Sequence, residues 1–396
     1  MSPTKRRRSG LSLLACSAVM IASCASTDYG TRVAGDRPQD LSTTEASLWY
    51  QMDEAETSLR TSGAVITDAA LNDFVGGVLC DVAVDHCDDL NLYIVESPTF
   101  NAFMAPNGMS VIYSGMLLRI EDESQLAAVL SHEFVHFQEN HTLEMHGAMR
   151  NARIYGTLIG SVAAAATGGI GGSLSDLATA GALLSFSREK EEEADRLGQR
   201  FMADAGYNVG SASELWENLQ AELQVSDFER RRDSAGGTGF FDTHPGVEER
   251  IAQLRMRSAE FAPVETDALA YRERIRPFLR DWLDAEITLR DPGRTLHLVD
   301  RLAALETDMG VLEYARGRIY ALRNEVGDAD AALQAYTLSI GYSDAPANSW
   351  RGIAEIHRAN GDNAAAADAF EIYLERSPDA RDAALVHALI ETLRGN

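Results

Sequence analysis

Basic residues are scarce in this 396-residue chain: 35 Lys and Arg stand against 60 Asp and Glu, which gives a formal net charge of −25 at pH 7. Binding to duplex nucleic acid requires clustered Lys and Arg that neutralise phosphates, and no long basic stripe occurs beyond the N-terminus. The composition therefore argues against a nucleic-acid partner. It is neither fibrous nor disordered in type, and the length suffices for two domains, each with its own core.

Cysteine is also scarce, with four residues in the chain. Neither Cys80 nor Cys87 has the spacing of a zinc finger. In an oxidising compartment these two residues could close a small loop as a disulfide, and two buried free thiols are the alternative.

Long apolar runs are missing as well. Residues 11–21 follow a basic segment at 5–8 and are too short to span a bilayer comfortably, so they predict a signal peptide over 1–23. The Ile-Ala-Ser that precedes Cys24 resembles a bacterial lipobox, which implies cleavage before Cys24 and lipidation of its thiol. An ordinary secretory signal with an incidental cysteine is the alternative.

The predicted lipoprotein would lie at the periplasmic face of the outer membrane of a Gram-negative type bacterium. Ala25 follows the lipidation site, and the resemblance to lipoproteins implies outer-membrane sorting because an aspartate there is the usual retention signal of the inner membrane. The polar residues 24–43 then predict a flexible tether between the lipid anchor and the first folded domain.

What the sequence does contain is an HExxH motif, formed by His132, Glu133 and His136. Histidines at i and i+4 lie on one helical face, so both can bind one tetrahedral cation while the intervening glutamate faces the bound water. Asp122 is placed to cap this helix, and apolar residues recur every four positions along it. The sequence therefore predicts that the motif lies in a helix and binds a catalytic zinc ion.

A second amphipathic stripe includes Glu191 and Asp195, which share one helical face. We predict that Glu191 is the third zinc ligand. A ligand imidazole usually donates its other N–H to a carboxylate, and Asp195 fits that role. The alternative is that 189–193 is only a solvated acidic face, which the preceding HExxH helix argues against.

Two segments near the motif admit a functional and a plain interpretation. Strands predicted at 90–95 and 109–113 flank Asn101, Ala102 and Phe103, which form either a substrate-binding edge strand or a simple hairpin connection. The Gly- and Ala-rich residues 155–182 form either a lid over the cleft or a helical hairpin.

His244 stands before a proline, which favours extended backbone and can hold an imidazole out of a helix and in a cleft. A lone histidine is more often structural. Arg250 follows one to two turns later.

The C-terminal part, 263–396, contains a repeat. Gly327-Asp328 and Gly361-Asp362 are 34 residues apart, and Tyr336 matches Phe370. This period predicts an α-helical domain of tetratricopeptide-like repeats after a domain at 44–262. Repeats of this kind indicate a binding surface without naming its ligand.

These motifs resemble the bacterial relatives of the CAAX prenyl protease and HtpX family of zinc metallopeptidases, especially the BepA-like periplasmic members with C-terminal tetratricopeptide repeats. The resemblance covers most of 45–396. It implies an α+β, mainly α fold: a zincin-type metallopeptidase domain with a small sheet, followed by the repeat domain. It also implies one Zn²⁺ per chain on His132, His136 and Glu191, with Glu133 as general base. His141 recurs in the family but lacks the spacing of a third ligand, so we interpret it as structural.

In BepA-like members the histidine of the His-Pro pair approaches the metal, so the resemblance implies a regulatory or oxyanion role for His244, with Arg250 nearby. The predicted function is an endopeptidase for unfolded or misassembled envelope proteins. A chaperone that contacts the outer-membrane assembly machinery through its repeats is the alternative, with a mostly latched protease. An inert zinc-stabilised scaffold is a third interpretation, but it gives Glu133 no reason to lie between two ligands.

Overall fold

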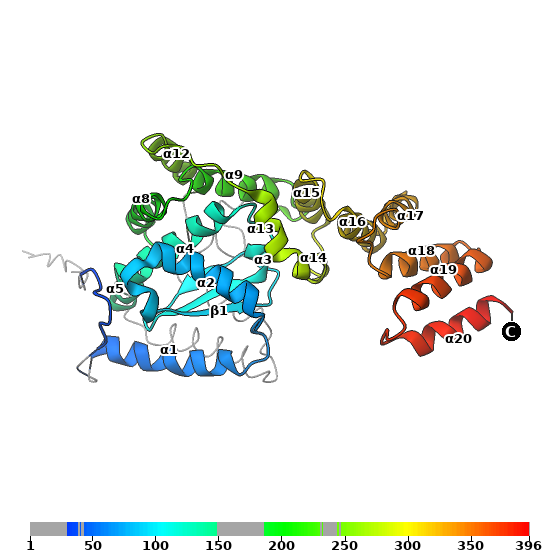
Figure 1. Ribbon diagram of the computed structural model, residues 1–396, viewed down its shortest axis with the longest axis horizontal. Coiled ribbons are helices and arrows are strands. Elements are labelled where there is room, and N and C mark those ends of the chain that lie inside the picture. The colour runs from blue at the N-terminus through cyan, green and yellow to red at the C-terminus, as the bar shows by residue number, and fades with distance from the viewer. Residues whose placement is uncertain are drawn as a thin grey trace, which may run out of the picture.

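The computed structural model describes residues 30–38, 40, 43–148, 186–229, 232, 244 and 247–395, and these residues form a mostly helical fold around one small sheet (Figure 1). The predicted signal peptide, Cys24 and the predicted lid at 155–182 lie outside the described residues. Among the helices of the described ranges, none combines the length and apolarity that crossing a bilayer would require.

The sheet has three strands in the order β1-β3-β2: β1 (Asn91–Val95) pairs parallel with β3 (Met109–Tyr113), and β2 (Ala102–Met104) pairs antiparallel with β3. The predicted strands at 90–95 and 109–113 are therefore present. Gly108 has a φ of +91°, and a Cβ there would lie 1.9 Å from the carbonyl oxygen of Asp89. Only glycine fits this turn into β3.

Both faces of the sheet are covered, so β3 is buried along its whole length. Helix α1 (Thr44–Arg60) lies on one face, where Val111 and Tyr113 pack, and α2 (Ala69–Ala83) and α4 (Glu123–Gln138) lie on the other, where Ile112 packs (Figure 1). Because side chains alternate along a strand, each β3 residue serves one of two cores. This arrangement places α4 directly on the sheet.

Helix α4 begins as predicted at Asp122, whose side chain accepts a hydrogen bond from the backbone N–H of Gln125 at 2.8 Å. It packs against α8 (Arg188–Asp204), which Ser187 caps in the same way. A Cβ on Gly198 of α8 would lie 3.2 Å from the hydroxyl of Ser131, so glycine permits this close approach. The two helices that carry the predicted ligands are thereby joined.

The other elements described before residue 263 are η1 (Val84–Asp89), α3 (Ser114–Leu117), α5 (His141–Ala148), α9 (Ser211–Gln224) and α12 (Val247–Ser258). A disulfide joins Cys80 at the end of α2 to Cys87 in η1. The structure therefore contains the disulfide rather than two free thiols.

Part of the predicted tether is packed against the domain rather than free. Arg32 is buried, its guanidinium lies 4.5 Å from the ring centre of Phe137, and its Nη2 donates to Asn140 Oδ1 at 2.6 Å. The backbone N–H of Arg32 also donates to the carbonyl of Gln138 at 2.7 Å. The cation–π contact of Arg32 with Phe137, together with these hydrogen bonds, anchors this polar segment on the domain.

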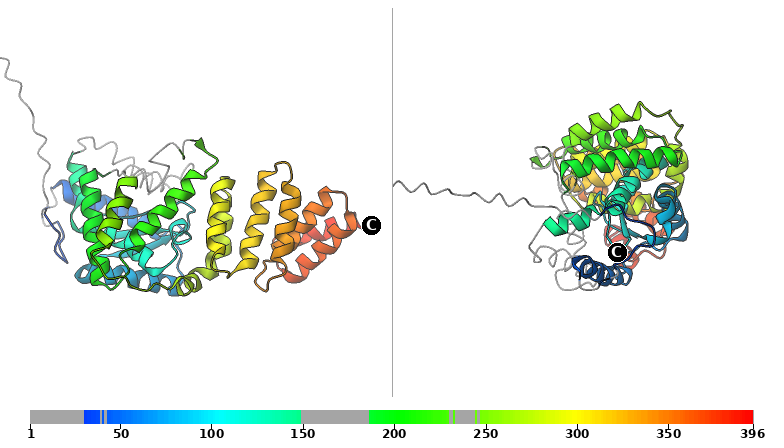
Figure 2. Two further views of the ribbon diagram at one scale, coloured as in Figure 1. Left: turned by 90° about the horizontal axis from the view of Figure 1, so that it is seen from above. Right: turned by 90° about the vertical axis from the view of Figure 1, so that its left-hand side faces the viewer.

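The chain after 263 forms a row of helices that extends away from the sheet (Figures 1 and 2). Their bounds are α13 (Ala268–Ile275), η2 (Arg276–Phe278), α14 (Leu279–Ile287), α15 (Pro292–Ala303), α16 (Met309–Arg323), α17 (Asp328–Ser339), α18 (Asn348–Ala359), α19 (Asn363–Arg376) and α20 (Ala383–Leu393). Tyr336 of α17 packs between Gly317 and Gly352, where added Cβ atoms would lie within 2.5 Å of its ring. Tyr336 and Phe370, matched in the repeat, are both buried.

The hydrophobic core does not break at the predicted boundary between 262 and 263. One core cluster runs from the sheet through α13, α14 and α15 to Ile319 in α16, and a second extends from Tyr314 to Ile390. The first helices of the row are therefore packed as part of the domain that contains the sheet.

A buried cluster of charges reinforces this continuity. Arg119, which is 1% exposed, follows α3 and contacts Glu222 of α9 and Glu286 of α14, with Nη2 to Oε1 distances of 2.7 and 2.9 Å. Arg294 and Arg301 of α15 also approach Glu222, at 3.7 and 4.0 Å. The cluster links three helices across the predicted boundary.

Candidate metal centre

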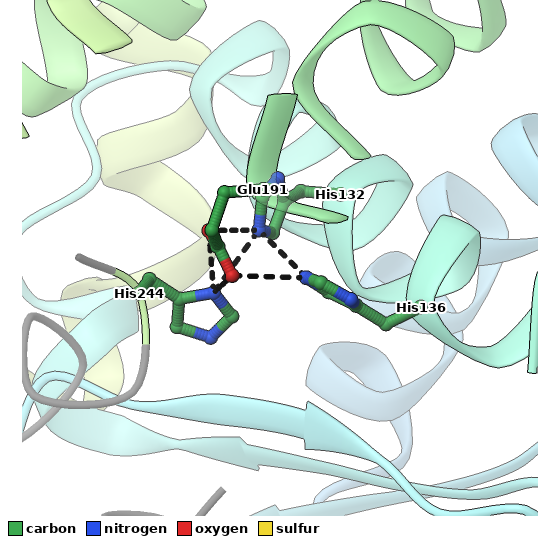
Figure 3. A group of neighbouring side chains, drawn as sticks. All are labelled: His132, His136, Glu191 and His244. Carbon is green, nitrogen blue, oxygen red and sulfur yellow. Dashed lines mark hydrogen bonds and ion pairs between the residues drawn. The ribbon is translucent and has the colours of Figure 1, made fainter. Parts of the chain in front are cut away.

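The imidazoles of His132 and His136 lie on one side of α4, and their Nε2 atoms are 3.1 Å apart. Both side chains are buried, and they point toward Glu191 of α8 (Figure 3). Glu191 Oε2 lies 3.4 Å from Nε2 of His132, and Oε1 lies 3.5 Å from Nε2 of His136. The structure thus brings together the three residues predicted to bind zinc.

His244 joins this group from a segment far along the chain. Its Nδ1 lies 3.2 Å from Nε2 of His132 and 3.0 Å from both carboxylate oxygens of Glu191. The four side chains each offer one ligand atom, and all of these atoms lie within 4.8 Å of one another. The flanking Thr243 and Pro245, on which the sequence argument for His244 rested, lie outside the described residues.

The spacing of these atoms fits a small tetrahedral cation. Bonds of about 2.0–2.1 Å to zinc place tetrahedral ligand atoms about 3.3 Å apart. Five of the six residue pairs have nitrogen or oxygen atoms 3.0 to 3.5 Å apart, and the sixth pair, His136 with His244, lies within 4.8 Å. Imidazole nitrogens and a carboxylate oxygen are donors that zinc prefers. We conclude that the residues present fit a metal ion, with three ligands from helices α4 and α8 and a fourth from His244.

Glu133 lies beside this group without closing a bond to it. Its Oε1 is 3.6 Å from Nε2 of His244, and this oxygen has no hydrogen-bond partner within the described ranges. Burial is the main reason that the pKa of Glu133 rises to about 8. A buried carboxyl oxygen that lacks a partner is costly, so it indicates a group held ready for one.

Asp195, one turn after Glu191 on α8, orients His132 from behind. Its Oδ1 lies 3.0 Å from Nδ1 of His132, which leaves Nε2 facing the other ligands. Burial alone would raise the pKa of Asp195, but the charge and hydrogen bonds of Arg250 outweigh it and lower that pKa to about 2. The carboxylate thus stays ionised and accepts the N–H of His132.

Arg250 of α12 is placed on the carboxylates. Its Nε and Nη2 donate to the two oxygens of Asp195 at 2.8 and 2.7 Å, and its Nη1 lies 2.9 Å from Glu191 Oε2. Its guanidinium also lies over the ring of Trp216, 4.6 Å from the ring centre. Burial alone would raise the pKa of Glu191, but the charges of His244 and Arg250 hold it well below the ordinary value. Arg250 is thus engaged by both carboxylates, and the oxyanion role for His244 or Arg250 stays a prediction.

The predicted substrate strand is at an edge of the sheet. Ala102 and Phe103 belong to β2, which among the described residues pairs only with β3, and Asn101 precedes it as a buried residue. Strand β2 packs against α4, which carries the ligands. An edge strand in this position can pair with an extended peptide.

Three further residues contact the site and were not assigned to it from the sequence. His141 Nδ1 lies 2.8 Å from Nδ1 of His136, and Glu193 Oε2 lies 3.2 Å from the other ring nitrogen of His141. Phe186 stacks on the ring of His136, with ring centres 3.9 Å apart and an angle of 14° between the planes. The five-residue step from His136 to His141 was the only sequence signal for this group, and nothing in the sequence marked Phe186.

Comparison with known proteins agrees with this geometry. Residues 67–258 match the model of Peptidase family M48. The chain is 34% identical over 177 residues to the mitochondrial metalloendopeptidase OMA1 of Schizosaccharomyces pombe, covering 44% of this chain and 48% of that protein. It is 26% identical over 222 residues to the beta-barrel assembly-enhancing protease of Escherichia coli, covering 52% of this chain and 42% of the relative. The chain thus spans less than half the length of these relatives, and the matched segment contains the complete candidate metal centre.

Proposed function

We propose that this chain, whose residues 67–258 are similar to Peptidase family M48, is a zinc-dependent endopeptidase of the bacterial envelope. The observation that carries the proposal is the convergence of His132, His136, Glu191 and His244, with Glu133 beside them, whose buried Oε1 lacks a hydrogen-bond partner among the described residues. A structural metal site would need the four ligands but not the buried carboxyl.

The residues of the site divide the work of peptide hydrolysis. A zinc ion bound there would polarise the carbonyl of the substrate peptide bond and lower the pKa of the water bound to the ion. His132, His136 and Glu191 would hold the ion, and Asp195 fixes the ring of His132. Glu133 accepts a proton from the attacking water and delivers it to the leaving amine as the carbon–nitrogen bond breaks. The substrate backbone would pair with the edge strand β2 as an added strand of the sheet, which aligns it with the site.

His244 fills the position that a fourth metal ligand would take, so in the described arrangement the metal site is closed to water and substrate. Its Nδ1 approaches His132 and Glu191, while its Nε2 faces Glu133. Water and substrate need that space, and catalysis therefore requires His244 to move aside. We propose that His244 is a latch that can be opened.

The envelope setting and the substrates complete the proposal. Lipidation of Cys24 would anchor the chain at the periplasmic face of the outer membrane, and unfolded or misassembled envelope proteins would be its substrates. The helices from α16 to α20 would act as tetratricopeptide-like repeats, because residues 34 apart, Tyr336 and Phe370, occupy equivalent buried positions. The printed name of the Escherichia coli relative, which refers to beta-barrel assembly, supports a partner in the outer-membrane assembly machinery.

A second candidate function is that of a chaperone or assembly factor whose protease is latched most of the time. The approach of His244 to the other ligands favours it, because a closed site leaves the row of helices as the working surface. In a bacterium that lacks the gene, rescue of envelope assembly by the Glu133→Gln variant would support this second function over the first.

The test of the proposed peptidase is Glu133→Gln in the full chain, with casein as an unfolded substrate. We expect one zinc per chain to be retained and the cleavage rate to fall by about 10²–10⁴-fold, the usual contribution of a general base. Glu123→Gln is the matched control, since Glu123 is exposed on the same helix. Casein cleavage by Glu133→Gln at the wild-type rate would refute the proposal.

A further inference from the structure

The two histidines of the HExxH motif are supported from behind by different groups. Nδ1 of His132 lies 3.0 Å from the carboxylate of Asp195, whereas Nδ1 of His136 lies 2.8 Å from another imidazole nitrogen, Nδ1 of His141. We propose that His141 and Glu193 form a positioning pair that orients the ring of His136 toward the metal, in the way that Asp195 orients His132. This inference rests on the proposed zinc-dependent function.

The hydrogen bonds of His136 and His141 determine which ring nitrogen of each residue carries the hydrogen. Nε2 of His136 faces Nε2 of His132 at 3.1 Å and must keep its lone pair to bind a cation. The ring hydrogen of His136 then lies on Nδ1 and is donated to Nδ1 of His141. The hydrogen of His141 is left on Nε2, which donates to Oε2 of Glu193 at 3.2 Å. A single chain of hydrogen bonds therefore runs from the ligand outward to a carboxylate.

This accounting also explains why His141 is not itself a ligand. Both of its ring nitrogens are used, one by His136 and one by Glu193, and it is 1% exposed. A histidine needed only to fill space could be replaced by a phenyl ring, whereas a buried imidazole is stable only when its polar atoms have partners. These two hydrogen bonds therefore indicate that His141 supports the predicted ligand His136.

Neighbouring contacts hold the pair in place. Nζ of Lys190 lies 3.4 Å from Glu193 and 2.9 Å from Glu144 of α5, so the carboxylate of Glu193 is tied to the helix that begins at His141. The preceding residue, Asn140, has a φ of +55° and accepts a hydrogen bond from Arg32 at 2.6 Å. The packed N-terminal segment therefore helps to set the position of His141.

The ring of His136 is also restrained on its face. Phe186, immediately before the capping residue of α8, stacks on it with ring centres 3.9 Å apart. The stack restrains rotation of the imidazole about its Cβ–Cγ bond but lets the ring slide within its own plane. The hydrogen bond to His141 restrains that sliding, so the two contacts are complementary.

Three variants of the full-length protein test the proposal, with the zinc dissociation constant measured by chelator competition and the visible spectrum of the Co²⁺-substituted protein. His141→Phe keeps a planar aromatic ring but has no acceptor, and we expect about 10–100-fold weaker zinc binding and shifted Co²⁺ bands. His141→Asn keeps an acceptor oxygen near the place of Nδ1, so we expect it to restore most of the affinity. Glu193→Gln should weaken binding less than His141→Phe.

Glu192→Gln is the matched control for Glu193→Gln, because Glu192 is a neighbour on α8 that pairs only loosely with Arg257, at 3.5 Å. Thermal unfolding of each zinc-free variant identifies any that fails to fold, and Glu193→Gln then decides the question. Wild-type zinc affinity and Co²⁺ spectrum in His141→Phe, or an Asn variant as weak as the Phe variant, would overturn the proposal. Because zinc binding is measured without substrate, this outcome is independent of whether Glu133→Gln abolishes cleavage.

Discussion

Two buried clusters of charged and polar side chains in the described part of the chain, around Arg119 and at the metal centre, differ in how their members pair. Around Arg119, guanidinium groups meet carboxylates: Glu222 and Glu286 each contact arginines from neighbouring helices. Burial alone would raise the pKa of Glu222, but the charges of Arg119 and Arg294 lower it. At the metal centre, by contrast, ring nitrogens of His132 and His136 face each other at 3.1 Å.

The difference separates a structural cluster from a functional one. In the Arg119 cluster guanidinium groups lie against carboxylates, so the buried charges offset one another, although Glu286 Oε2 and Arg301 Nε lack hydrogen-bond partners among the described residues. In the metal centre lone pairs converge on a common point, an arrangement that only a cation or shared protons can stabilise. Opposite charges in contact in the Arg119 cluster, and converging lone pairs at the metal centre, are therefore what distinguish the two.

Replacement of Arg119 tests the structural cluster and should have the largest effect. In Arg119→Met the carboxylates of Glu222 and Glu286 lose their central partner in a buried place, and we expect a loss of about 3–5 kcal/mol in the free energy of unfolding. Urea unfolding measures it. Arg394→Met is the control: Arg394 pairs with Asp368 and Glu371 on the surface, so the expected loss is about 0–1 kcal/mol. Equal losses in the two variants would contradict the distinction.

Removal of the metal tests the other cluster. Zinc at 100 times its dissociation constant should stabilise the folded chain by about 2.7 kcal/mol, and a chelator should remove that contribution. Thermal unfolding with and without chelator gives the value. The same shift is expected in Arg119→Met, because the two clusters share no residue and distant effects add. An unfolding temperature insensitive to chelation would show that the ligand cluster does not bind zinc.

Opening the latch should have the smallest effect. His244→Ala removes the group that occupies the fourth position, and we expect casein cleavage to rise about five- to tenfold, which corresponds to about 1 kcal/mol. His387→Ala, an exposed histidine on α20, is the control. A fall in the rate of His244→Ala with zinc still bound would instead assign His244 a part in stabilising the transition state.

The sequence predicted the local parts of the site better than its long-range parts. Capping by Asp122 and the spacing of His132 and His136 are local, and the helix they predict is present at Glu123–Gln138. The pairing of β1 with β3 and the burial of Arg119 depend on contacts between distant segments, for which residue type gives no signal. Arg32 shows the same limit, because a polar segment is expected to be free unless its stacking partner is known.

Helix α16 has a consequence for how the protein responds to force. One of its faces carries Leu312 and Ile319 into the core that surrounds the sheet, while Tyr314 belongs to the core of the last four helices. A force applied to the C-terminal helices is therefore transmitted through α16 to the core beside α4, because α16 packs in both cores. An exchange of the C-terminal helices with those of another protein would have to keep α16, since a cut before it would remove Leu312 and Ile319 from the core that surrounds the sheet.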